Sequence, residues 1–453
     1  MKLKYSELFN KINYFESQVN ELSEFILYGY LISINGLILE VVGLKAPIGA
    51  ECIIERIIDN KPSNISAEVI SFNKDKTLLF SFDKTYGILP GAKVFLKNFK
   101  DSNYFIKKMP LGNNLLGRIL NGKGELLDNG PELDKQCFSI IKSKHINPLD
   151  RKPIVDVLDT GIRAINGLIT IGRGQRIGIF SESGVGKSIL LGMMAKYTQA
   201  DIVVIGLIGE RGRELKNFIE NILGLDGLNK SVVIASPADE SPLLQIKAAL
   251  YATSIAEYFR DYQNKNVLLI MDSLTRYAMA EREVALSLGE LPVSKGYPSS
   301  VFSKIPILVE RSGNTNSKGS ITAFYTVLTE NEDDQDPISH ICRSILDGHI
   351  ILSKHYADLG HYPAIDIESS ISRIMPDIVS NNQYSNACYF KRLFTSYQRN
   401  KDLINIGAYI KGNDSILDNA IQKWTSLEAF LKQSTSEKSN YLNTCLELEK
   451  ILI

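Results

Sequence analysis

The run of eight residues from Ser181 to Ser188 has the composition and spacing of a phosphate-binding loop. Gly184 and Gly186 can turn their backbone N–H groups toward phosphate oxygens. Lys187 can reach the β- and γ-phosphates, and a helix beginning here would direct its N-terminal dipole at the anion. We therefore predict a nucleotide site formed by Ser181, Glu182, Ser183, Gly184, Val185, Gly186, Lys187 and Ser188, with the Ser188 hydroxyl as a ligand of Mg²⁺.

The first two residues of this loop depart from the usual form of the motif, which opens with glycine. Ser181 takes that first place and the acidic Glu182 follows it. An inward-pointing Glu182 would weaken phosphate binding slightly, and we expect this side chain to point to solvent. A glycine turn without a ligand, or a nucleotide-binding scaffold without turnover, is the alternative interpretation. The strand expected before the loop, the helix after it and the intact Gly-Lys-Ser favour the nucleotide site.

Three charged residues follow other expected strands of the same domain. Asp272 ends an apolar run, and in a phosphate-loop protein such a carboxylate holds the Mg²⁺ shell. Open α/β sheets bind ligands beyond the carboxyl ends of their strands, so Glu210 should lie near the γ-phosphate and orient the attacking water. Arg211 could stabilise charge on the transferring phosphoryl group. A surface cluster of salt bridges is the alternative for Glu210 and Arg211.

The elements that would position these residues alternate between strand and helix patterns from residue 159 to about residue 375. This alternation predicts a mostly parallel sheet with helices on its faces, the architecture of an α/β phosphate-loop domain. The strands are expected over 176–180, 202–208, 232–235, 267–271, 321–328 and 349–352, and helices over 243–262 and from 273 to about 287.

The rest of the chain divides into parts of different pattern. Apolar residues recur on one helical face of residues 1–22, which predicts a helix that docks on a partner protein rather than on lipid, with packing on the protein's own body as the alternative. Short β-rich runs (29–34, 38–42, 52–57, 67–72 and 77–82) predict a small antiparallel sheet or barrel. Residues 110–157 read as a loop-rich connector. The predicted domains are a docking helix (1–24), a β-barrel (25–97), the phosphate-loop domain with its connector (98–377) and a C-terminal helical domain (378–453).

Composition limits the class of protein. The chain has 453 residues, 44% of them hydrophobic and 23% charged, which excludes a disordered chain. Its 51 Lys+Arg balance 51 Asp+Glu, which argues against a protein that grips nucleic acid. Five scattered cysteines without a CxxC pair indicate reduced thiols rather than a disulfide or zinc framework. No apolar run approaches the roughly 18 residues of a membrane span. We expect a cytoplasmic protein, held at a membrane only by partners.

Several longer motifs together resemble the rotary and export ATPase family, which includes the F1 catalytic subunits. The resemblance runs from about residue 29 to residue 431, and its motifs are similar to those of the type III protein export ATPases in particular. Tyr397–Asp414 resembles the flagellar branch, since the virulence-secretion branch tends to carry Glu where Ala408 stands. The motifs are LDTGIRAINGL (Leu158–Leu168), RGQRIGIF (Arg173–Phe180), DSLTRYAMAEREVALSLGE (Asp272–Glu290), KGYPSSVF (Lys295–Phe302) and PAIDIESSIS (Pro363–Ser372).

The resemblance implies a RecA/F1-like fold and a Mg²⁺-dependent, protein-secreting ATPase. It implies that Glu210 is the catalytic carboxylate and that Arg373 is an arginine finger that reaches the neighbouring subunit's site. It also implies that Tyr362 stacks on adenine, although a Tyr before Pro is commonly core packing. A chain that carries a phosphate loop, a carboxylate base and a trans-acting arginine would form complete sites at every interface of a closed ring of identical copies, and the resemblance implies six copies.

The resemblance further implies four partners in protein export. They are a stalk-like regulator on the N-terminal helix, a central coiled-coil protein in the ring, chaperone–substrate complexes and the membrane proteins of the export gate. The alternatives are a virulence-type secretion ATPase, the catalytic subunit of a rotary ATP synthase and, disfavoured by the neutral charge, an RNA translocase.

Overall fold

The computed structural model describes residues 28–58, 61–97, 108–133, 138–140, 146–316, 318–329 and 336–452, of which 138–140 are described by their backbone. It divides into two compact units, Met1–Lys107 and Lys108–Ile453. The helix predicted over residues 1–22, and with it the docking helix assigned to 1–24, lies outside the described residues.

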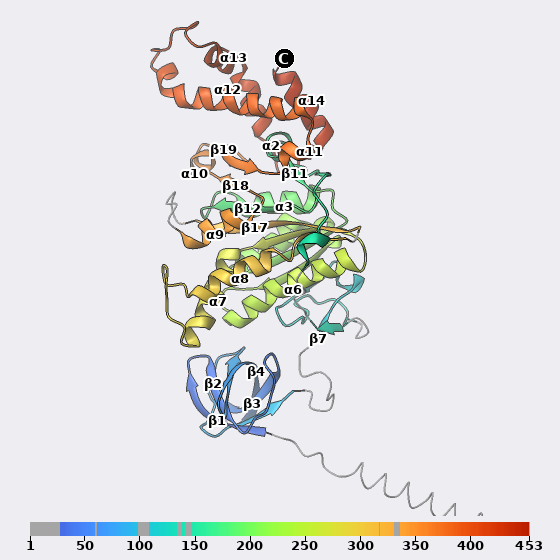
Figure 1. Cartoon of the computed structure of the whole chain (residues 1–453), viewed down its shortest axis with the longest axis vertical. Coiled ribbons are helices and arrows are strands. Elements are labelled where there is room, and N and C mark those ends of the chain that lie inside the picture. The colour runs from blue at the N-terminus through green and yellow to red at the C-terminus, as the bar shows by residue number, and fades with distance from the viewer. Residues whose placement is uncertain are drawn as a thin grey trace, which may run out of the picture. The chain divides into compact units, whose positions relative to one another are not determined.

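The first unit is a closed antiparallel barrel with the strand order β1-β2-β5-β4-β3-β6 (Figure 1). Alternate side chains such as Leu39, Val41 and Ile54 are fully buried inside it, which is the period-2 pattern that the sequence shows. The predicted barrel is therefore confirmed. A sixth strand that the sequence pattern did not reveal closes the barrel between β1 and β3. The strands are β1 (Tyr28–Asn35), β2 (Ile38–Val42), β3 (Glu51–Ile58), β4 (Lys61–Asn73), β5 (Lys76–Ser81) and β6 (Lys93–Leu96).

The second unit contains a large, mainly parallel sheet with the order β19-β18-β12-β17-β15-β13-β14-β8. Only β19 on β18, and the short β16 on β17, pair antiparallel in this sheet. Every strand expected in this unit is present, within one residue at each end, whereas β19 was not predicted as a strand. The strands are β8 (Ile119–Leu120), β12 (Arg176–Ser181), β13 (Ile202–Ile208), β14 (Ser231–Ser236), β15 (Asn266–Asp272), β16 (Gly313–Asn314), β17 (Ser320–Leu328), β18 (Gly348–Leu352) and β19 (Ile365–Ser372).

Helices cover both faces of this sheet, as the two-sided burial of strands such as β13 requires. On one face, Ile177, Ile205 and Ile270 share a buried apolar cluster with α3 and the C-terminal helices. On the other face, Gly206 lies against Ala252 of α6. The helices of this unit's centre are α2 (Arg163–Leu168), α3 (Lys187–Tyr197), α4 (Gly212–Asn217), α5 (Gly224–Asn229), α6 (Pro242–Asp261), α7 (Leu274–Ser287), α8 (Ser299–Val309), α9 (Pro337–Ile345) and α10 (Lys354–Asp358), with a π-helical turn over Phe218–Leu223.

The C-terminal part is helical, as predicted, and packs through aromatic side chains. Tyr397 stacks on Trp424 with ring centroids 3.7 Å apart, and Phe390 contacts Phe430 at 5.3 Å. In Figure 1 the three longest of these helices lie beyond α2 and β19, away from α6–α8. Their bounds are α11 (Met375–Ile378), α12 (Asn381–Asn405), α13 (Ser415–Leu431) and α14 (Tyr441–Leu452).

The stretch that the sequence presented as a connector contributes to the sheet. β8 lies within it and pairs parallel with β14 at the edge. Its two hydrogen-bonded residues are too few to give a periodic pattern. The remaining short elements are β7 (Lys108–Pro110) paired with β9 (Phe138–Ile140), β10 (Val157–Leu158) paired with β11 (Ile171–Gly172), and 3₁₀ turns over Asn113–Leu115 and Pro148–Asp150. No helix in the described part of the chain is both long and apolar enough to span a bilayer.

Candidate active site

The phosphate loop connects the carboxyl end of β12 to the first turn of α3, as predicted. Gly184 and Gly186 have φ angles of 83° and 89°, in the left-handed region that favours glycine. A Cβ atom on Gly186 would lie 3.2 Å from Cε1 of Tyr362, whereas Gly184 faces open space. The loop therefore leaves room for an anion against its backbone, at the N-terminus of an eleven-residue helix.

Three charged side chains meet at this loop from three separate elements. The Lys187 ammonium lies 2.6 Å from Oδ1 of Asp272 and 3.2 Å from Oε1 of Glu210. Asp272 ends β15, and Glu210 follows β13, the next strand of the sheet. Thr326, on the strand between β12 and β15, donates a hydrogen bond of 2.6 Å to the same Oδ1 of Asp272. The structure thus brings together the lysine and both carboxylates that the sequence selected.

The electrostatics of this cluster follow from burial and from two negative groups sharing one cation. Burial and the Asp272 carboxylate raise the pKa of Glu210 above the ordinary range, although Lys187 acts in the opposite direction. Burial lowers the pKa of Lys187, but the two carboxylates outweigh it and keep that pKa above its usual value. Glu210 is therefore a stronger base than a solvated glutamate.

The oxygen donors at the loop fit a magnesium ion bound together with phosphates. Ser188 lies in the first turn of α3, and Asp272 supplies a carboxylate at the sheet edge. Mg²⁺ is typically held by one or two protein oxygens, with phosphate and water completing the octahedron. No group of three or more His, Cys, Asp or Glu side chains able to hold a metal occurs among the described residues. The Ser188 hydroxyl and the Asp272 carboxylate fit a metal that arrives with a nucleotide.

An apolar hollow of about 210 Å³ adjoins the loop on the α3 side. Tyr362, whose surface is 44% exposed, lines it together with Ile189 and Met193 of α3. The position is suited to a planar base whose phosphates rest on the loop, because aromatic and aliphatic side chains form most of its lining.

One wall of this hollow was not predicted from the sequence. Gln433, Ser434 and Thr435, in the segment after α13, also line it. Gln433 donates from its backbone to the Tyr362 carbonyl at 3.0 Å, and the Tyr197 hydroxyl donates to the Thr435 carbonyl at 2.8 Å. No local motif marks these polar residues, since only tertiary packing brings them to the loop.

The loop's unusual residues lie apart from the charged cluster. Glu182 was expected to point to solvent, but it is half-buried and lines a second hollow of about 710 Å³ with His349 and Lys354. Ser181 is buried as the last residue of β12, and its hydroxyl has no hydrogen-bond partner within the described chain. Ser183 is exposed at the turn.

The structure does not bring Arg211 to Lys187. Its side chain is 82% exposed and lies 3.6 Å from Glu214, the surface pairing that the sequence left open as an alternative. A different cation, Arg276 of α7, lies behind the Glu210 loop, where a Cβ on Gly209 would be 2.8 Å from Arg276 Cβ. Its buried Nε has no hydrogen-bond partner in the described part of the chain. The sequence signal was present in the Asp-Ser-Leu-Thr-Arg run, but its Arg was not singled out.

Arg373 follows β19 and is exposed. Its Nη2 donates to the carbonyl of Arg343, in the last turn of α9, at 3.0 Å. Helix C-termini favour cations, so this contact holds the guanidinium without neutralising it. Within the described residues it has no carboxylate partner.

Family profiles match the three main parts of the chain. The nucleotide-binding domain of the ATP synthase alpha/beta family matches residues 161–372, and the beta-barrel domain of that family matches residues 31–95. The C-terminal domain of the T3SS EscN ATPase matches residues 379–450.

Individual relatives extend this match over the full length. The flagellum-specific ATP synthase of Buchnera aphidicola subsp. Schizaphis graminum is 70% identical, covering 100% of this chain and 97% of that protein. That of Salmonella typhimurium is 53% identical, covering 100% and 99%.

Solved structures of a virulence secretion ATPase share the fold. The assembled ATPase EscN from the enteropathogenic E. coli type III secretion system is 42% identical with a TM-score of 0.85, covering 94% of this chain and all of that one. EscN in complex with its central stalk EscO also has a TM-score of 0.85, at 41% identity and the same coverage.

The fold and the site define a phosphate-loop ATPase of the rotary type, an enzyme that hydrolyses ATP. The chain belongs to the ATP synthase alpha/beta family and, within it, to the flagellum-specific branch of the type III export ATPases.

Proposed function

We propose that the chain hydrolyses ATP to ADP and phosphate at its phosphate loop and couples this reaction to flagellar protein export. The meeting of Lys187, Glu210 and Asp272 at one loop carries the proposal. The part-buried Glu210 accepts a proton from the attacking water, and Lys187 neutralises charge on the β- and γ-phosphates. Adenine rests in the hollow beside Tyr362.

Mg²⁺, bound by Ser188 and Asp272, would polarise the phosphoryl oxygens when it enters with ATP. In the described structure Lys187 is shared between Asp272 and Glu210. A bound triphosphate attracts the lysine ammonium away from Glu210, which leaves this carboxylate to orient water. Binding of the triphosphate thus moves Lys187 to the phosphates and frees Glu210 to act as the base.

Arg373 acts in trans, on the nucleotide bound by a neighbouring copy. It is exposed, lacks a carboxylate partner within the described chain and makes no hydrogen bond to its own phosphate loop. A head-to-tail ring of identical chains supplies each site with one such arginine. The solved relative EscN is described as assembled and as bound to a central stalk, which supports a ring, with six copies expected, around a coiled-coil partner.

The other partners are inferred from the branch of the family. We infer that a stalk-like regulator binds the N-terminal segment. We infer further that chaperone–substrate complexes and the membrane proteins of the export gate are partners of the chain. The protein would act in the cytoplasm, at the inner face of the cytoplasmic membrane through those partners.

The test measures ATP turnover per chain against protein concentration, for the native chain and for Arg373→Ala. Native turnover should rise cooperatively as rings assemble. Arg373→Ala should bind ATP normally but turn over about 10³-fold more slowly, as for other trans-acting arginines. A flat concentration dependence, or normal turnover by Arg373→Ala, would refute the shared site.

A further inference from the structure

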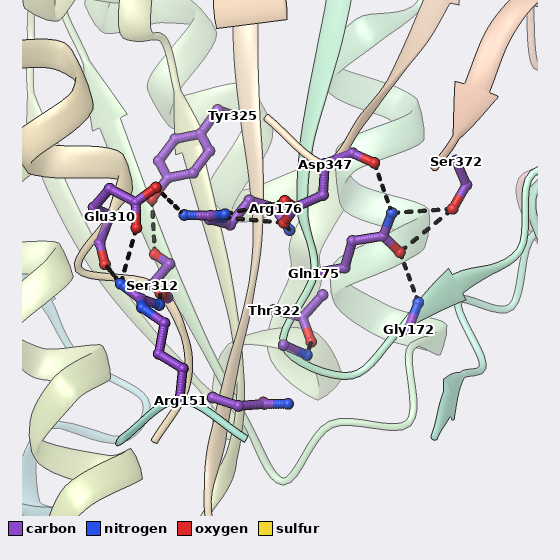
Figure 2. A network of polar contacts seen from close by, with 12 residues as sticks. Arg151, Gly172, Gln175, Arg176, Glu310, Ser312, Thr322, Tyr325, Asp347 and Ser372 are labelled. Atoms are coloured by element: carbon purple, nitrogen blue, oxygen red, sulfur yellow. Dashed lines mark hydrogen bonds and ion pairs between the residues drawn. The ribbon is translucent and has the colours of Figure 1, made fainter. Parts of the chain in front are cut away.

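The amino end of β12, opposite the phosphate loop, carries a polar network that the catalytic proposal does not use (Figure 2). Gln175 lies at its centre and has no exposed surface. Its side-chain oxygen accepts from the Gly172 backbone N–H at 2.8 Å, which fixes the orientation of the amide. The amide nitrogen then points at β18 and β19.

Gln175 bonds to both chain segments that hold Arg373. Its Nε2 donates to the Asp347 carbonyl at 3.2 Å and to the Ser372 hydroxyl at 3.0 Å. The Arg373 backbone N–H donates to the same Asp347 carbonyl at 3.0 Å. The buried Gln175 amide therefore bonds both to Ser372, the residue before Arg373, and to the Asp347 carbonyl, which also accepts the Arg373 N–H.

Asp347 is itself held firmly by Arg176, the first residue of β12. The guanidinium donates through Nε and Nη2 to the two carboxylate oxygens, both at 3.0 Å, and the Arg176 backbone N–H adds a third bond of 3.0 Å. Arg176 Nη1 contacts Glu310 at 2.5 Å. A two-pronged arginine–carboxylate pair restricts direction as well as distance. Asp347 is thus a fixed support.

The backbone before Arg373 also lies in close contact with β18. A Cβ on Gly348 would lie 2.5 Å from the Ile371 carbonyl oxygen and 3.1 Å from Ser372 Cα. Only a residue without a side chain allows the two strands to approach so closely. The backbone position of Arg373 is therefore set by β18, by Asp347 and by Gln175, while its side chain extends to the surface.

We propose that Gln175 and Asp347 are positioning residues for Arg373, fixing the arginine that each chain presents to its neighbour's ATP. The inference rests on the proposed trans role of Arg373. β12 begins at this network and ends at the chain's own phosphate loop. One strand therefore connects the ATP site of a chain with the arginine that the same chain presents to its neighbour. Misplacing a catalytic group by about 1 Å can cost a hundredfold in rate.

The test uses Gln175→Met, which keeps the side-chain length but removes the hydrogen bonds to Asp347 and Ser372 together with the acceptor of the Gly172 N–H. We expect kcat to fall about tenfold to a hundredfold while KM for ATP changes less than about twofold, because the variant's own phosphate loop is intact. The matched control is Thr322→Val. Thr322 accepts from the Gly174 N–H at 2.8 Å in the same turn, but it has no bond to the Arg373 segments, so kcat should stay near native.

Mixed rings then separate positioning from a general loss of structure. Lys187→Ala chains cannot turn over ATP but still present a sound Arg373. Random 1:1 mixing with Gln175→Met pairs a sound loop with a sound arginine at about a quarter of the interfaces, so activity should rise well above either parent. The Arg373→Ala plus Lys187→Ala mixture should be rescued in the same way.

Each outcome decides one question. If the Arg373→Ala mixture is rescued and the Gln175→Met mixture is not, Gln175 acts on its own site or on stability, and the positioning proposal fails. If neither mixture is rescued, the trans role of Arg373 fails. Native kcat for Gln175→Met would also overturn the proposal. Should Gln175→Met not fold, Ser372→Ala removes the bond between Gln175 and the Ser372 hydroxyl in a milder way and takes its place in the same mixtures.

Discussion

Each end of β12 carries a cation between two carboxylates, and the two ends differ in almost everything else. At the carboxyl end Lys187 is shared between Asp272 and Glu210, each on a different strand or loop. The lysine is a compact charge on a flexible stem, so it can transfer from carboxylates to phosphate at little cost. The pKa of Glu210 stays raised, which indicates that Lys187 does not fully compensate its negative charge.

At the amino end Arg176 lies between Asp347 and Glu310. Burial works against the charge, but the hydrogen bonds and attraction of both carboxylates hold the pKa of Arg176 above its ordinary value. The planar guanidinium locks Asp347 in two parallel bonds. The contrast shows that charged groups can take part in catalysis where they are incompletely paired beside a glycine loop. Where they are fully paired, they fix the position of the backbone instead.

The largest expected difference separates the two cations. Lys187→Ala should reduce ATP turnover by about a thousandfold, as for loss of an essential charge-stabilising group. Arg176→Ala should lower the free energy of unfolding by about 3 kcal/mol, because it leaves the part-buried Asp347 carboxylate without its cation, whereas the exposed Glu310 keeps Arg151. Turnover assays and urea unfolding of both variants check this. Substantial turnover by the first, or native stability of the second, would break the comparison.

The base at the carboxyl end should show itself in the pH dependence. Glu210 accepts a proton only when ionised, and its pKa is raised, so kcat should fall with decreasing pH at a midpoint above about 4.3, the ordinary value for glutamate. Glu210→Gln should bind ATP but lose about 10²- to 10³-fold in kcat and lose this acid limb. Circular dichroism at each pH controls for unfolding. An unchanged acid limb in Glu210→Gln would assign it to another group.

Two arginines near Glu210, Arg276 and Arg211, differ in burial and in ion pairing, and they should differ in their effect on kcat. Arg276→Ala should lower kcat about tenfold or more, since Arg276 is partly buried behind the Glu210 loop with an unbonded Nε. Arg211→Ala should change kcat less than about twofold, because exposed ion pairs contribute little. The reverse order would show that Arg211 turns inward when nucleotide binds.

The smallest effect concerns Ser181. Its buried hydroxyl lacks a partner in the described chain, so Ser181→Ala should raise the free energy of unfolding by up to about 1 kcal/mol with kcat unchanged. Thermal unfolding and a KM measurement test this together. A several-fold rise in KM for ATP would instead place the hydroxyl on the nucleotide.

Residues close in sequence or fixed by strand ends were predictable. The phosphate loop, Asp272 and Glu210 follow from strand patterns, because parallel strands deliver their carboxyl ends to one edge. Arg211 shows the limit of that reasoning. It is adjacent to Glu210 in sequence, yet the backbone turns its side chain to solvent, and a charge run alone does not reveal this direction.

Long-range partners were not predictable from pattern. Gln175 and Asp347 are 172 residues apart, and Gln433 reaches Arg163 across 270 residues. Polar side chains in loops carry no periodicity that foretells such contacts. β6 and β8 were missed for a related reason, because four residues and two residues are too short for alternation to be recognised.

The wall formed by Gln433, Ser434 and Thr435 has a consequence for biosynthesis. A ribosome makes the phosphate loop long before it makes this wall, and the hollow beside Tyr362 is open on that side until α13 has emerged and packed. The proposed adenine site is therefore completed only after residues 433–435, which follow α13, have been synthesised and have packed against Tyr362.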